Sequence, residues 1–132
     1  MAETTIRPFL MFEGQAEEAM NLYLSLFPGA RVDSITRYGP EGPGPEGSVQ
    51  LAAFTVADQP VMCIDSHVSH DFGFTPSFSF FVDVASEEEL SALAAALGEG
   101  GTVLMPLDNY GFSRKFTWLN DRFGVSWQLN LP

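Results

Sequence analysis

Phe9-Leu10-Met11-Phe12 before Ala16-Glu17-Glu18, and Phe78-Ser79-Phe80-Phe81 before Ser86-Glu87-Glu88, are two copies of one pattern. In each copy an apolar, strand-like run is followed within a few residues by an acidic helix start. One such unit alone would expose the apolar face of its sheet, whereas two units together can cover it. The repeat therefore predicts an α+β fold made of two related modules.

The first module is predicted to cover residues 1–66. Apolar residues at helical spacing favour a helix over 15–27, which the Pro28-Gly29 pair ends. The remaining apolar runs favour strands at 6–12, 31–37, 49–56 and 60–66. The expected order is therefore βαβββ, with a hairpin at 57–59 between the last two strands.

The second module repeats this order over residues 77–132. Ser86 and Glu89 have the spacing of a capping box, which predicts a helix that ends at the glycines near residue 100. Strands are predicted at 78–84, 102–107, 114–120 and 125–131. Residues 67–76 form a linker, and the whole chain is one domain in which two βαβββ modules form a curved mixed sheet around a cleft.

The segment from Tyr38 to Gly47 cannot form regular structure, because seven of its ten residues are Gly or Pro. It has no following helix start and no lysine, so it does not match a phosphate-binding loop. Its composition predicts a mobile flap over residues 39–47 at the mouth of the cleft.

The charge of the chain excludes some partners. Six basic and 17 acidic residues give a net charge of −11, and nucleic-acid binding requires clustered Lys and Arg that this chain lacks. An anionic membrane surface would repel it, and no apolar run reaches the length of a membrane span. The single cysteine, Cys63, lies in an apolar run and is expected to be a buried, inert thiol. With no internal disulfide and no signal peptide, a cytoplasmic protein is expected.

Four stretches together resemble one family. They are Pro8 to Ala19, Leu26 to Ala30, Arg37-Tyr38-Gly39, and the most specific of them, Phe116 to Leu129. The chain resembles the vicinal-oxygen-chelate superfamily, which is the glyoxalase and bleomycin-resistance group. Within it the chain is similar to the PhnB-like branch, which is often labelled as 3-demethylubiquinone methyltransferase-like. The sequence has no Gly-rich strand-to-helix turn for S-adenosylmethionine, so that label receives no support from its motifs.

The resemblance implies a mechanism in which a divalent metal on His and Glu ligands binds vicinal oxygens of a substrate. The ligand positions of the superfamily fall here at Arg7 or Pro8, at Cys63 to Asp65, at Ser77 and at Gln128. The usual Asp-x-x-Gly-x-x-x-Glu-Leu pattern is present at 121–129, with the amide of Gln128 in place of the carboxylate. Because such metals need imidazole or anionic oxygen, no metal or other cofactor is expected, and Asp65 is a weak candidate ligand if a divalent metal does bind.

Six residues are the candidates for ligand binding: Asp65, His67, Tyr110, Arg114, Trp118 and Gln128. Asp65, His67 and His70 form an Asp-x-His-x-x-His run, which is either a metal cluster or a polar linker after a strand. His67 could also act as an acid or base near neutral pH.

The other four candidates come from the second module. Gln128 faces away from Trp127 and Leu129, so it either orients a ligand in the cleft or lies in solvent. Trp118, on the neighbouring strand, is either part of the core or a wall against which a ligand stacks. Tyr110 and Arg114 lie in one of very few basic segments, where Arg114 either attracts an anionic substrate or pairs with a surface carboxylate.

Two functions follow from these residues, and whether the protein is an enzyme stays open. The first is a PhnB-like, bleomycin-resistance-type module that binds a small metabolite in the cleft. The alternative is a metal-dependent lyase, isomerase or dioxygenase of the vicinal-oxygen-chelate type that acts on a small polar substrate. A homodimer is expected in either case, because open sheet edges need cover and the resembled family pairs its units.

Overall fold

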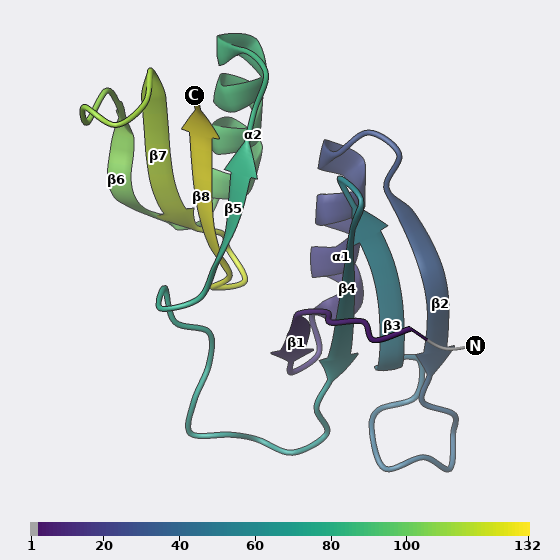
Figure 1. Cartoon of the computed structure of the whole chain (residues 1–132). Helices are drawn as coiled ribbons and strands as arrows, with labels where there is room; N and C mark the ends of the chain where they lie inside the picture. The colour runs from purple at the N-terminus through teal and green to yellow at the C-terminus, as the bar shows by residue number, and fades with distance from the viewer. Residues whose placement is uncertain (1–2) are drawn as a thin grey trace. The chain divides into compact units, whose positions relative to one another are not determined.

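The computed structural model describes residues 3–132. They divide into two compact units, with the boundary along the chain between His70 and Asp71. Each unit contains a four-stranded sheet with one helix against it (Figure 1). The α+β class with two βαβββ modules is confirmed. That the two modules form one domain around a cleft stays a prediction.

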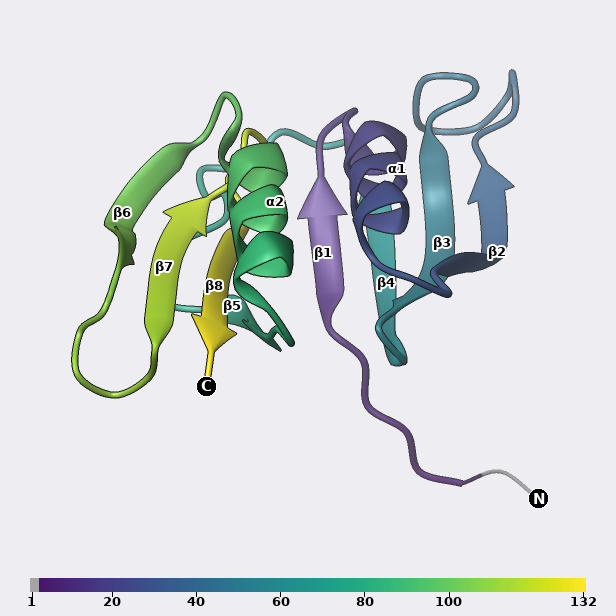
Figure 2. The same ribbon diagram turned by 90° about the horizontal axis from the view of Figure 1, so that it is seen from above.

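The first unit contains β1 (Phe9–Phe12), α1 (Ala16–Leu26), β2 (Arg31–Arg37), β3 (Val49–Val56) and β4 (Gln59–Asp65). Its strands lie in the order β1-β4-β3-β2, with β1 parallel to β4 and the other pairs antiparallel. The helix α1 covers one face of this sheet (Figure 2), where Tyr23 stacks on Phe54 with ring centroids 6.4 Å apart.

The strand β1 begins at Phe9, three residues later than the sequence pattern predicted. Pro8 has no N–H to donate, and its carbonyl accepts a hydrogen bond from the Met62 N–H at 2.9 Å. Before it, Ile6 is 91% exposed. The proline therefore sets the start of the strand.

The second unit contains β5 (Ser79–Asp83), α2 (Glu87–Gly98), β6 (Thr102–Asp108), β7 (Lys115–Asn120) and β8 (Ser126–Leu131). Its order, β5-β8-β7-β6, repeats that of the first unit, again with one parallel pair. The helix α2 packs on β7 and β8 (Figure 2). Trp127 and Leu129 are buried, and the Trp127 ring lies 4.8 Å from that of Phe80.

The two helices begin in different ways. The predicted capping box of α2 is confirmed: Ser86 Oγ accepts a hydrogen bond from the Glu89 N–H at 3.2 Å, and Glu89 accepts one from the Ala85 N–H at 2.9 Å. At α1 the N-cap residue is Gln15, whose side chain makes no capping hydrogen bond. The Ala16 N–H, the first of α1, and the Gly14 N–H just before the helix instead donate to Asp65, at the end of β4.

Candidate functional site

The face of the second sheet that α2 does not cover carries a row of polar side chains. Trp127 and Leu129 alternate with Ser126, Gln128 and Asn130 on β8, so the latter three lie on the helix-free face. The ladder places Ser79, Phe81 and Asp83 of β5 beside them. On the other side of β8, the side chains of Phe116, Trp118 and Asn120 of β7 lie on the same helix-free face.

Hydrogen bonds hold this polar row in one arrangement. The Trp118 indole N–H donates to Ser126 Oγ at 2.8 Å, and Ser126 Oγ lies 2.7 Å from Ser79 Oγ. The Gln128 amide nitrogen donates to the same Ser79 oxygen at 3.3 Å. Trp118 and Gln128 are half-buried, so each presents a fixed polar or aromatic surface without being part of the core.

A group of aromatic rings adjoins this row. The Phe116 ring is contacted by Phe112 at 5.0 Å, Tyr110 at 6.2 Å and Phe81 at 6.3 Å between ring centroids. Phe112 is 63% exposed and Phe81 is 55% exposed. We call Phe81, Tyr110, Phe112, Phe116 and Trp118 the aromatic face. Exposed rings gathered in this way mark a binding surface more often than a solvated one.

Three of the six predicted site residues lie in the aromatic face or the polar row beside it: Tyr110, Trp118 and Gln128. The fourth candidate from the second module, Arg114, is exposed at the start of β7, and its Nε donates to the Pro132 carbonyl at 2.7 Å. Phe81, Phe112, Phe116 and Ser79 were not among the predicted site residues.

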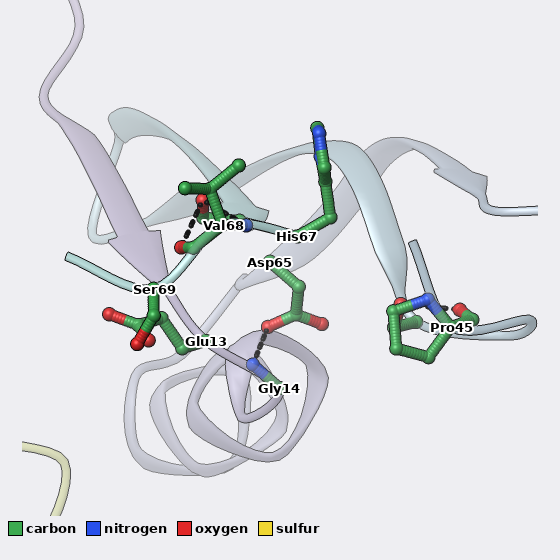
Figure 3. A pocket seen from close by; sticks show the side chains of 9 residues that line it. Glu13, Gly14, Pro45, Asp65, His67, Val68 and Ser69 are labelled. Atoms are coloured by element: carbon green, nitrogen blue, oxygen red, sulfur yellow. Dashed lines mark hydrogen bonds between the residues drawn. The ribbon is translucent and has the colours of Figure 1, made fainter. Parts of the chain in front are cut away.

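Asp65 has a different environment in the first unit. It is 3% exposed, and one carboxylate oxygen accepts hydrogen bonds from the Gly14 N–H at 2.8 Å and the Ala16 N–H at 2.9 Å. The other oxygen accepts a hydrogen bond from the Val49 N–H at 3.0 Å. Figure 3 shows the carboxylate turned toward the start of α1. This group fastens β4 to the helix and to β3.

His67 and His70 do not converge on Asp65. The His67 ring meets the Tyr38 ring edge-on at 6.2 Å and points away from the Asp65 carboxylate (Figure 3). His70 Nε2 lies 2.9 Å from Ser66 Oγ. A hollow of about 260 Å³ adjoins these residues and is lined by Glu13, Gly14, Pro45, Ser48, Asp65, Ser66, His67, Val68 and Ser69.

The Gly-Pro segment at 39–47, predicted to be a mobile flap, is anchored at its base, and its mobility stays a prediction. Its base is closed by hydrogen bonds from the Tyr38 N–H to the Ser48 carbonyl and from the Gly47 N–H to the Tyr38 carbonyl, both at 2.9 Å. The Tyr38 ring is buried inside it, and a Cβ on Gly44 would lie 2.6 Å from that ring. The Tyr38 hydroxyl then donates to the Asp65 carbonyl at 3.1 Å. A packed ring therefore anchors the loop to β4.

Similarity to known proteins extends over both modules of the chain. Residues 4–130 match the family model described as 3-demethylubiquinone-9 3-methyltransferase. The chain belongs to that family. The PhnB protein from Bacillus cereus is 53% identical, with 98% of this chain and 100% of that chain covered and a TM-score of 0.95. The protein PA1353 from Pseudomonas aeruginosa is 30% identical over 98% of both chains, with a TM-score of 0.83.

A more distant structure shows the same fold. The fosfomycin resistance protein FosX from Listeria monocytogenes, solved with Mn(II) and 1S,2S-dihydroxypropylphosphonic acid, is 10% identical with a TM-score of 0.64, and the alignment covers 100% of this chain and 94% of that one. The chain is thus PhnB-like, as its motifs predicted, and it shares its fold with FosX. No curated protein matches it.

The residues of this PhnB-like chain do not fit the metal that the resemblance to the vicinal-oxygen-chelate superfamily implies. Gln128 supplies a neutral amide whose nitrogen is already bound to Ser79, and the Asp65 carboxylate is occupied by three backbone N–H groups. Over residues 3–132, no group of three or more His, Cys, Asp or Glu side chains is placed to hold a metal ion. The expectation of a metal-free protein stays a prediction, now with a structural reason.

Cys63 offers no alternative nucleophile. Burial, with a smaller contribution from the nearby Asp65 charge, raises the pKa of its thiol to about 12. The thiolate is the reactive form, so this cysteine is unreactive at neutral pH. Within residues 3–132, no helix is long and apolar enough to cross a membrane.

Proposed function

We propose that this PhnB-like protein binds a small molecule against the aromatic face of its second sheet. The observation that carries the proposal is the pairing of exposed rings with a fixed polar row. Phe81 and Phe112 offer apolar surface, while Gln128 and Ser79 offer hydrogen bonds whose directions are already set. Binding sites typically combine apolar walls with a few fixed polar groups in this way.

The energetics favour a ligand with an apolar body. Covering roughly 100 Å² of exposed ring surface stabilises a complex by about 2.5 kcal/mol before entropic costs. Because Trp118 and Gln128 are already held by hydrogen bonds, little of that gain is lost in ordering the site. A rigid wall of this kind suits a protein that sequesters a ligand.

The alternative function, a metal-dependent enzyme on a small polar substrate, gains no donor set from the residues described above. Among the described residues, the five rings of the aromatic face include no carboxylate or histidine for acid–base work. We therefore favour binding, and the substrate-transforming function stays the second hypothesis.

The binding proposal can be tested through the two tryptophans. The chain has two indole N–H groups: that of Trp118 lies on the aromatic face, and that of Trp127 is buried and donates to Asp121 at 3.0 Å. A library of aromatic fragments should shift the Trp118 indole signal in ¹H–¹⁵N spectra and leave that of Trp127 in place. Equal shifts of both signals, or none across the library, would contradict the proposal.

A matched pair of variants tests whether the fragments bind at the aromatic face. Phe112→Ala removes the most exposed ring of the aromatic face and should weaken fragment binding about tenfold, in line with the loss of one stacking contact. Phe78→Ala removes a ring that is 57% exposed and packs on Phe80 instead. Phe78→Ala should therefore retain wild-type affinity.

The homodimer is part of the proposal. The edge strands β2 and β6 are exposed along most of their length, with Val32 on β2 and Val103 and Leu104 on β6 among their exposed apolar residues. Uncovered edges of this kind favour pairing with another chain. We expect light scattering to give a particle of twice the 14.4 kDa chain mass, and a monomer at micromolar concentrations would contradict this.

A further inference from the structure

We infer that the ligand of the aromatic face is a cation, namely a protonated amine that carries an aromatic or apolar body. This inference rests on the proposed function, and it names the chemical class that the same site would take. Three observations support it: an unpartnered buried acceptor, an exposed carboxylate beside it, and a surrounding charge that repels anions.

The acceptor is the amide oxygen of Asn130. This side chain lies on the helix-free face of β8 and is 9% exposed. Its nitrogen donates to an Asp83 carboxylate oxygen at 2.9 Å, and its Oδ1 is buried with no hydrogen-bond partner. A buried acceptor left unpaired costs about 1–3 kcal/mol, so an ammonium group that displaces the atoms covering this oxygen and donates a hydrogen bond to it recovers that cost.

Asp83 fixes which way this amide points. A carboxylate can only accept hydrogen bonds, so the Asn130 nitrogen must face Asp83. The amide oxygen is then directed to the opposite side of the planar group. On β7, the residue paired with Asn130 is Phe116, the centre of the aromatic face. The free acceptor and the rings are therefore neighbours.

The carboxylate of Asp83 adds charge to this acceptor. Asp83 is an exposed residue of β5, and one of its oxygens holds the Asn130 amide. An ammonium group at this position would meet a negative charge and a carbonyl acceptor, with the exposed ring of Phe81 two residues before Asp83 on β5. Each of these contacts stabilises a cation, and the ring contact is specific to cations.

The acidic groups on this part of the unit and the net charge of the chain favour a cation. On β6, Asp108 lies opposite Phe116. Lys115 points to α2, where its Nζ lies 3.4 Å from a Glu87 oxygen. Arg114, the candidate for attracting an anion, is exposed and keeps its positive charge, and its Nε donates to the Pro132 carbonyl at 2.7 Å. With a net charge of −11, the chain attracts cations and repels anions over distance.

Three probes of nearly the same shape separate charge from apolar contact. These are 2-phenylethylamine, 2-phenylethanol and 3-phenylpropionate, each titrated against the full chain with the Trp118 indole signal as readout. We expect the amine to bind at least about tenfold more tightly than the acid, and its affinity to fall as salt is added. The alcohol should lie between them.

Two variants that each remove one negative charge identify the contact. Asp83→Asn keeps an oxygen that can accept from Asn130, so the amide stays oriented, and it should weaken amine binding about fivefold to tenfold while leaving the alcohol unchanged. Glu88→Gln removes an exposed charge on α2, which covers the opposite face of the same sheet. Glu88→Gln should have little effect on any probe.

The outcomes separate this inference from the proposed function. If the acid binds as tightly as the amine, or if Glu88→Gln weakens the amine as much as Asp83→Asn does, the cation preference is wrong while the aromatic face remains a binding site. If none of the three probes shifts the Trp118 signal, the inference and the binding site fall together.

Discussion

Replacement of Asp65 by alanine is expected to lower the free energy of unfolding by about 3–5 kcal/mol. The carboxylate is 3% exposed and accepts hydrogen bonds from three backbone N–H groups, those of Gly14, Ala16 and Val49. Without it, buried donors at the start of α1 and on β3 lose their partner, and each such loss costs about 1–3 kcal/mol. Urea denaturation followed by circular dichroism measures the effect.

Two further variants make the Asp65 result specific. Asp65→Asn keeps one acceptor oxygen but places an NH₂ group against a backbone N–H, so its loss should be smaller than that of alanine. Glu13→Ala removes an exposed carboxylate that lines the same hollow and should change stability by less than about 0.5 kcal/mol. A loss below 1 kcal/mol for Asp65→Ala would show that the three hydrogen bonds do not hold the unit together.

The role of Asp65 illustrates what a linear pattern leaves undetermined. The Asp-x-His-x-x-His run suggested a site because its three side chains are of ligand type, yet the carboxylate serves the start of a helix about 50 residues earlier in the chain. A local cap can be recognised from spacing, as Ser86 and Glu89 were. A cap supplied by a distant strand becomes visible only when the pairing of β1 with β4 is known.

The fold itself was predictable because its signals are local and occur twice. Apolar runs, the capping box and the Pro28-Gly29 stop each depend on a few adjacent residues, and the second module repeats the order of the first. The hairpin between β3 and β4 followed from the same reasoning: Ala57 and Asp58 adopt positive φ values of 46° and 64°. Two such residues form the turn that hairpins prefer.

The site was predictable only in part. Alternation along β8 placed Gln128 opposite Trp127 from sequence alone. The importance of Phe81 depends on its register with Gln128 across a parallel pair, which joins residues 47 positions apart. No spacing rule gives that register, because parallel strands are connected through a long crossover. The same holds for Asn130, whose unpaired oxygen follows from the position of Asp83.

A second large effect is expected at Gly101, between α2 and β6. A Cβ at this position would lie 2.1 Å from the Asn120 carbonyl oxygen and 2.9 Å from the Asp121 carbonyl carbon, and both are backbone atoms. Backbone cannot rotate away as a side chain can, so Gly101→Ala must push β6 away from β7. We expect a loss of about 3 kcal/mol in the free energy of unfolding.

The control for Gly101 is a glycine of the same unit that has room for a side chain. Gly73→Ala would place its Cβ with no atom within 4 Å and should change stability by less than about 0.5 kcal/mol. Neither residue has a positive φ, so the contrast isolates steric contact from backbone strain. Asn120 and Trp118 are two residues apart on β7, so their side chains lie on the same face. Gly101→Ala should therefore also shift the Trp118 indole signal. If Gly101→Ala is as stable as Gly73→Ala, the close approach of residue 101 to the backbone of Asn120 and Asp121 is wrong. The packing that positions β7, which carries Phe116 and Trp118, would then be wrong as well.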